Sequence, residues 1–166
     1  MVTPRSYHDA GANFATIDLF KKLADEEKLP VRLYVMVRGE SNARMDSLLD
    51  TYRMQGYGHG YLTVHSIKRQ IDGALGSNGA WLLEPYVDLP RSTGLALEQP
   101  ESVQRAAEIA MKHGFQVNTH AIGDRANRET LGRTRSTMPT RASRRRSLAP
   151  SPSESLPTSR CCRRTS

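Results

Sequence analysis

The segment SIKRQIDGALGSNGAWLLEPY, residues 66–86, decides how the rest of this 166-residue chain is interpreted. It begins as a strand, enters a glycine-rich turn and is followed downstream by FQVNTHAIGDR, residues 115–125. Each segment places a polar side chain at the end of an expected strand, Lys68 in the first and His120 in the second. Parallel α/β folds build their active sites from polar groups at strand ends.

Short apolar runs alternate with amphipathic stretches on both sides of these segments. Strands are predicted at 31–37, 62–71 and 115–120, and residues 6–9 are interpreted as the end of another strand. Apolar residues at helical spacing predict helices over 14–27, 44–54 and 100–113, and a further helix begins at Arg125. Strand and helix therefore alternate four times, which favours βαβ units with parallel strands and right-handed crossovers.

An open doubly wound sheet and a (β/α)₈ barrel both satisfy this alternation. The turn after the first strand, residues 9–13, has too few glycines for a dinucleotide-binding loop. Polar residues instead follow the strands where a barrel builds its active site: His8, Asp9, Lys68, Asp72, His120 and Asp124. A complete barrel takes about 250 residues. We therefore expect an α/β chain that forms a partial (β/α)₈ TIM barrel of about four βα units.

The chain divides into two segments of unlike charge. Residues 1–131 hold 15 basic and 16 acidic side chains, a net charge of −1, whereas residues 132–166 hold nine arginines and Glu154, a net charge of +8. The first segment is predicted to be the barrel-like domain. The second is rich in Arg, Ser and Pro, lacks apolar periodicity and is predicted to be disordered.

Two interpretations of residues 132–166 stay open. They could form a basic arm, centred on Arg144 to Arg146, that binds nucleic acid or another acidic partner. Alternatively, they are the product of a reading-frame shift within the helix that begins at Arg125. The tail contains neither lysine nor an aromatic residue that could stack on bases. This composition favours the frame shift, so nucleic-acid binding is not expected.

Composition excludes several other classes of protein. The only cysteines are the adjacent Cys161 and Cys162, which leaves residues 1–131 without a disulfide or a thiolate metal site. No window approaches the ~18 consecutive apolar residues of a membrane span, and the first residues lack the apolar core of a secretory signal. A cytoplasmic location is expected, with no membrane partner.

Four segments together resemble amidohydrolase family 3, the branch of the metal-dependent amidohydrolase superfamily that includes enzymes similar to N-substituted formamide deformylases. They are YHDAG at 7–11, LPVRLYVMV at 29–37, IKRQIDGALGSNGAWLLEPY at 67–86 and HGFQVNTHAIGDRA at 113–126. The resemblance covers about residues 2–131. It implies a (β/α)₈ barrel of which this chain supplies strands two to five.

The resemblance also implies a metal centre. Lys68 matches a lysine that is commonly carboxylated and bridges two ions, and His120 matches a histidine ligand from the next strand. Asp72, Gly73 and Asp124 are expected to orient ligands or to contact substrate. The implied cofactor is one or two divalent ions, expected to be zinc, which lowers the pKa of bound water to about 7. The implied reaction hydrolyses non-peptide carbon–nitrogen bonds, of amide or formamide type, in a small molecule.

Without the resemblance, each residue has a simpler interpretation, Lys68 as a solvated strand residue and His120 as a structural histidine. The superfamily's His-x-His pair is also missing, and no histidine follows His120. Since a zinc site needs at least three protein ligands, we expect little or no activity from this chain alone. The alternative function is an inactive half-barrel that binds an acidic partner through its tail, or forms homo-oligomers or aggregates through exposed sheet edges.

Overall fold

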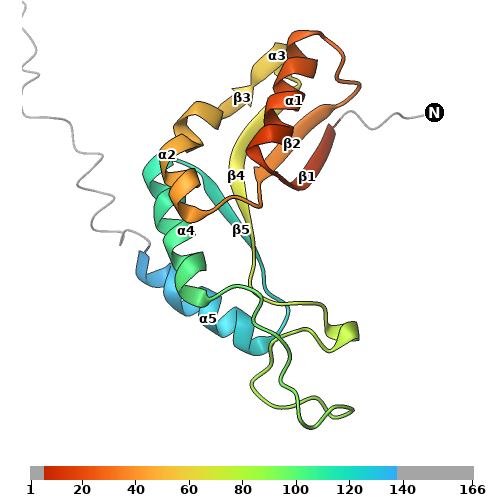
Figure 1. Cartoon of the computed structure of the whole chain (residues 1–166), viewed down its shortest axis with the longest axis vertical. Helices are drawn as coiled ribbons and strands as arrows, with labels where there is room; N and C mark the ends of the chain where they lie inside the picture. Colours follow the sequence, from red (N-terminus) through yellow and green to blue (C-terminus); the bar gives the residue numbers. More distant parts are fainter. Residues whose placement is uncertain (1–5, 138–166) are drawn as a thin grey trace, which may run out of the picture.

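The computed structural model of the chain describes residues 6–137 (Figure 1). Every strand and helix expected from the sequence is present, with bounds that differ by a few residues. In chain order the elements are β1 (Ser6–Ala12), α1 (Phe14–Asp25), β2 (Arg32–Val37), α2 (Asn42–Tyr52), β3 (Met54–Gly56), α3 (Tyr57–Gly60), β4 (Leu62–Gln70), the 3₁₀ turn η1 (Leu75–Ser77), α4 (Pro100–His113), β5 (Gln116–His120) and α5 (Asp124–Thr137).

Four of the strands form one parallel sheet in the order β1, β2, β4, β5. The short β3 pairs antiparallel with the beginning of β4, through Met54 and Val64. Helices α1, α2 and α4 contribute Phe14, Met45 and Ile109 to a single apolar core with the strands. The predicted α/β class with a parallel sheet is therefore confirmed.

The core lies between the helices and one face of the sheet. Most strand residues that point toward the helices are buried, whereas most of their neighbours along each strand are only half-buried. This alternation follows from the two-residue repeat of side chains along a strand. The fully buried apolar strand residues are Val35, Val37, Leu62, Val64 and Ile67, and Ser66 on β4 is fully buried as well. We call this the outer face of the sheet, and the opposite face the inner face.

Local sequence signals fix the helix ends. The side chain of Asn13 accepts a hydrogen bond from the Thr16 backbone N–H at the start of α1. Helix α4 begins with Pro100 and ends at Gly114, whose φ of 69° is the left-handed conformation that glycine adopts readily. These ends agree with those expected from the sequence.

Two segments differ from expectation. Residues 54–60 were expected only to end a helix, but they form β3 and the single turn α3, with Gly56 and Gly58 at positive φ. Helix α5 continues to Thr137, beyond the predicted domain boundary at Leu131. Residues 138–166, with Arg144 to Arg146, lie outside the described part of the chain, so the interpretations of the tail stay predictions. Between residues 6 and 137 no helix is both long enough and apolar enough to cross a membrane.

Candidate functional site

Lys68 and His120 lie on neighbouring strands near the carboxyl ends of the sheet. In the register of β4 and β5, Lys68 is opposite Asn118 and Gln70 is opposite His120. Lys68, Gln70, Asn118 and His120 therefore share the inner face, because paired residues in a sheet point to the same side. The structure thus brings together the two predicted metal ligands, on adjacent strands and two positions apart.

Neither predicted ligand is engaged by a neighbouring side chain. The Nε2 atom of His120 is buried and has no hydrogen-bond partner among the described residues. Lys68 is half-buried, and its amine has no hydrogen bond or ion pair within residues 6–137. Five buried side-chain atoms in the described chain lack a partner, and four of them belong to β4 or β5: His65 Nε2, Ser66 Oγ, Arg69 Nε and His120 Nε2. Unsatisfied polar groups therefore concentrate on these two strands.

The chemistry of the Lys68 amine and of His120 Nε2 shows how far these residues fit a metal ion. A buried imidazole nitrogen without a partner is a suitable zinc ligand, and a lysine amine can join such a site once it is neutral or carboxylated. However, no group of three or more His, Cys, Asp or Glu residues in the described part of the chain could hold a metal ion. Lys68 and His120 fit two positions of a metal site and do not complete one.

Asp72 is fully buried just beyond the end of β4, and backbone groups occupy both of its carboxylate oxygens. Oδ1 accepts a hydrogen bond from the Ile122 N–H at 2.9 Å, and Oδ2 accepts from the N–H groups of Gly123 at 2.7 Å and Trp81 at 2.9 Å. Ile122 and Gly123 directly follow the strand that carries His120. Asp72 therefore ties together the loops that follow β4 and β5.

Asp124 makes a second link between the same two loops. Its Oδ1 accepts hydrogen bonds from the N–H groups of Leu83, at 2.9 Å, and Arg125, at 2.8 Å. The Arg125 guanidinium lies 4.6 Å from the centre of the Trp81 ring, a cation–π distance. The side chain of Asp124 thus anchors the start of α5 to the loop after β4.

Close backbone contacts explain two glycines of the conspicuous motifs. A Cβ added to Gly123 would lie 1.9 Å from the Trp81 carbonyl oxygen, so no larger residue fits without moving the loop. The Gly73 N–H donates to the Gly79 carbonyl at 2.9 Å, and the two glycines pack backbone against backbone. The DGALGS and HAIGD motifs are therefore parts of one packed loop pair, and Gly73 serves its closure.

A small cavity of about 250 Å³ lies beside Lys68, and most of the residues that line it were not predicted as site residues from the sequence. Arg38 donates to Gln70 Oε1 at 2.7 Å. Arg69 points to the outer side, where it hydrogen-bonds to Asn42 and lies 3.5 Å from Glu98. Burial lowers the pKa of the Arg69 guanidinium, and the charge of Glu98 opposes that shift. The position of Arg38 directly after β2 was the signal that could have identified it.

A family model described as "Amidohydrolase family" matches residues 5–154. The chain belongs to the amidohydrolase family. It is 33% identical over 112 residues to "Putative amidohydrolase YtcJ" of Bacillus subtilis strain 168, a match that covers 68% of this chain and 20% of that protein. It is 45% identical over 67 residues to "Protein LONG AFTER FAR-RED 3" of Arabidopsis thaliana, which covers 40% of this chain and 12% of that one.

Solved structures show the same fold. An uncharacterised metal-dependent hydrolase from Pyrococcus horikoshii OT3 superposes with a TM-score of 0.63 at 30% identity, over 80% of this chain and 26% of that one. A second such hydrolase, from Pyrococcus furiosus, superposes with a TM-score of 0.62 at 23% identity, which supports the fold alone. This amidohydrolase-family chain spans between an eighth and about a quarter of the length of these relatives.

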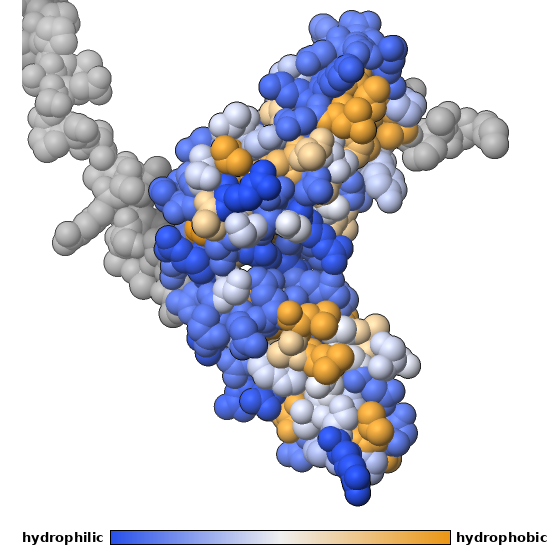
Figure 2. All heavy atoms as spheres, viewed as in Figure 1, coloured by the Kyte–Doolittle hydropathy of each residue, from blue (hydrophilic) through white to orange (hydrophobic). Residues whose placement is uncertain are grey.

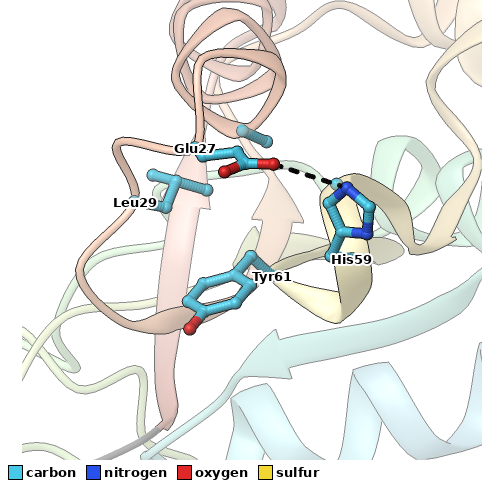
Figure 3. Close-up of a pocket in the computed structure, with 6 residues that line it drawn as sticks. Glu27, Leu29, His59 and Tyr61 are labelled. Carbon is cyan, nitrogen blue, oxygen red and sulfur yellow. Dashed lines mark ion pairs between the residues drawn. The ribbon is translucent and has the colours of Figure 1, made fainter.

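A second cavity lies at the start of β4, whereas Lys68 lies near the end of that strand; Figure 3 shows side chains that line this cavity. It has a volume of about 270 Å³ and lies between the end of α1, the turn α3 and the starts of β2 and β4. Glu27 and His59 face each other across it at 3.6 Å, with Leu29 and Tyr61 beside them. Both side chains are highly exposed, so this pair is a weak surface contact. His59 therefore lies outside the candidate site of this amidohydrolase-family chain.

Apolar side chains gather near the candidate site, over the lobe formed by the loop between β4 and α4 (Figure 2). The exposed apolar residues of this loop are Leu75, Leu83, Val87, Leu89, Leu95 and Leu97. Ile122, in the loop after β5, is also half-exposed. The loops that follow β4 and β5 thus present an apolar surface toward solvent.

Proposed function

We propose that this chain is part of a metal-dependent hydrolase that cleaves non-peptide carbon–nitrogen bonds in small molecules. The observation that carries the proposal is the pairing of Lys68 and His120 on the inner face, with the Nε2 atom of His120 buried and without a partner. Membership of the amidohydrolase family supports it. The relative from Pyrococcus horikoshii, named as a metal-dependent hydrolase, supports the metal.

The side chains have separate roles in this proposal. His120 would bind the ion through Nε2, and Lys68 would bind it as a carboxylated amine. Asp72 holds the backbone after His120 through Ile122 and Gly123, and so fixes the direction of β5 at the site. When bound, a divalent ion such as zinc polarises a substrate carbonyl and acidifies water near neutral pH.

The finer features of the proposal come from the sequence resemblance. They are zinc as the metal, one or two ions, a carboxylated Lys68 and a substrate of the N-substituted formamide type. Arg38 lies with Gln70 at the rim of the cavity beside Lys68, where its guanidinium could donate hydrogen bonds to a substrate carbonyl. Because Lys68 and His120 do not complete a metal site, we expect little turnover from one copy of the chain.

Zinc binding by the purified chain tests this function. We expect titration calorimetry to detect zinc binding that His120→Ala weakens at least about tenfold, since one of few protein ligands is lost. His59→Ala is the matched control, because His59 lies at the opposite end of the sheet and should leave zinc affinity unchanged. Zinc binding that survives both His120→Ala and Lys68→Ala would overturn the proposed site.

Turnover is the second measurement. We expect the zinc-loaded chain to hydrolyse a small N-substituted formamide slowly or not at all. Turnover that His120→Ala abolishes would contradict the expectation of low activity and support the site. Turnover that stays the same in His120→Ala would contradict the assignment of the reaction to Lys68 and His120.

A further inference from the structure

Only one face of the parallel sheet is covered. On the outer face, Val64 and Ile67 are completely buried under the helices. On the inner face, Met36, Lys68 and Asn118 remain half-buried within residues 6–137, and the core residues of α1, α2 and α4 pack with the other face. Parallel sheets occur almost only where both faces are covered. We therefore expect a second layer to cover the inner face, and residues 6–137 do not form one.

The sheet also has two open edges. Within the described residues, β1 pairs only with β2, and β5 pairs only with β4 among the strands. A groove of about 500 Å³ runs beside β5 between α4 and α5, where Val117 contributes to its floor and Leu131 is 66% exposed. At the other edge, Tyr7 on β1 is 62% exposed. Open edges of this kind pair readily with another chain.

The two edges are complementary in direction and in face. Every strand of the four-stranded path β1, β2, β4, β5 runs the same way, so β1 of one copy can continue the sheet beyond β5 of another. Tyr7 pairs with Leu33, whose side chain packs against the core, so Tyr7 lies on the outer face. Val117 pairs with Ile67 and shares that face. The Tyr7 ring would therefore meet a groove of mixed apolar and polar lining on the same side of the joined sheet.

We propose that two copies of this chain join edge to edge, β1 of each beside β5 of the other, and close an eight-stranded parallel barrel. A two-fold axis along the barrel relates the two identical seams, which is the commonest symmetry of soluble dimers. Four strands from each copy give the eight of a (β/α)₈ barrel. Closure turns both inner faces into the barrel interior and pairs the open edges of β1 and β5.

Closure has a consequence for the metal site, and this part rests on the proposed function. All eight strands run the same way, so the carboxyl ends of β4 and β5 from both copies lie at one end of the barrel. Two lysines and two histidines then surround a common axis. A single copy has no group of three suitable His, Cys, Asp or Glu residues among those described. The second copy would supply the ligands that the first one lacks.

The mass of the full chain in solution tests the closure. Light scattering after size exclusion is expected to give twice the 18.5 kDa of one chain. Tyr7→Asp and Leu131→Asp each place a charge in the seam and are expected to weaken the dimer at least about tenfold, since burying an unpaired charge is costly. Val87→Asp is the matched control, because Val87 is 98% exposed on the loop between β4 and α4. Far-ultraviolet circular dichroism checks that each variant keeps its helices.

Zinc content of the separated species is the second readout. We expect zinc to elute with the dimer, and His120→Ala to remove the zinc without changing the mass. A monomeric wild-type chain would overturn the closure, as would a larger assembly or a dimer that both seam variants leave intact. A dimer that breaks with both seam variants but holds no zinc would keep the closure and defeat the proposed metal site.

Discussion

Asp72 and His120 lie at the carboxyl ends of neighbouring strands and differ in how well their polar atoms are satisfied. The carboxylate of Asp72 accepts three backbone hydrogen bonds, each between 2.7 and 2.9 Å. The buried Nε2 of His120 has none within the described chain. The strand ends that carry them are nevertheless joined, because the N–H of Ile71, the residue before Asp72, donates to the His120 carbonyl at 3.0 Å.

This difference separates groups that build the site from groups that are available to a ligand. A buried polar group without a partner costs stability, and proteins retain such groups where they serve a function. Asp72 holds the two loops together through both of its carboxylate oxygens, whereas Lys68 and His120 lie on the inner face without a side-chain partner among the described residues. Four predictions sharpen or break this comparison, from the largest expected effect to the smallest.

Asp72→Ala is expected to have the largest effect on stability. It removes the acceptor of three buried N–H groups, and each unsatisfied donor costs about 1–3 kcal/mol, so we expect a loss of about 4 kcal/mol in urea unfolding. Asp124→Ala is the control, since its carboxylate is exposed and its loss should cost about 1 kcal/mol or less. Equal losses for the two variants would contradict the structural role of Asp72.

Ile67→Ala and Lys68→Ala compare the two faces of the sheet at adjacent positions. Ile67 is 0% exposed in the core, so its truncation should cost about 3 kcal/mol in the same assay. Lys68 has no partner among the described residues, and Lys68→Ala should change stability by about 0.5 kcal/mol at most. A large loss for Lys68→Ala would show that the amine is already bound within the fold.

His113→Asn is expected to have a smaller, pH-dependent effect. His113 is buried between α2 and α4, with Nδ1 at 2.8 Å from Asp50 and Nε2 at 3.2 Å from Asp46. The hydrogen bond to Asp50 and then that to Asp46 raise the pKa of His113, against the opposing effects of burial and of Lys112.

The direction of that pKa shift sets the pH range of the effect. The folded chain holds the proton more tightly than the unfolded chain, so the stabilisation is full below about pH 6.5 and is lost as the pH rises through the folded pKa. We therefore expect wild type and His113→Asn to differ more at pH 6 than at pH 9 in urea unfolding. His59→Asn is the control, because the exposed Glu27 contact should give a small difference at both pH values.

His120→Leu is expected to change the stability of the metal-free chain only slightly. The substitution removes a buried nitrogen that has no partner, so the free energy of unfolding of the metal-free chain should stay within about 1 kcal/mol of wild type. Zinc should stabilise wild type in thermal unfolding and leave His120→Leu unchanged. A loss of several kcal/mol without metal would mean that His120 is a structural histidine.

The local pattern of the sequence determined most of the fold. β-branched runs and helical spacing were enough to locate the strands and helices, because the two periodicities depend on neighbouring residues. Pro100 and Gly114 gave the limits of α4 for the same reason. The quoted motifs also indicated the family and drew attention to Lys68 and His120, whose role as ligands stays a proposal.

Only the tertiary structure decided which side chains contact each other and which stay without a partner. Asp72 binds Ile122 and Gly123, about 50 positions away, and His113 meets Asp46 from another helix. The sheet register places Lys68 and His120 on one inner face, and the fold leaves β1 and β5 as open edges. Such pairings join residues far apart in the chain, and local periodicity carries no information about which distant groups will meet.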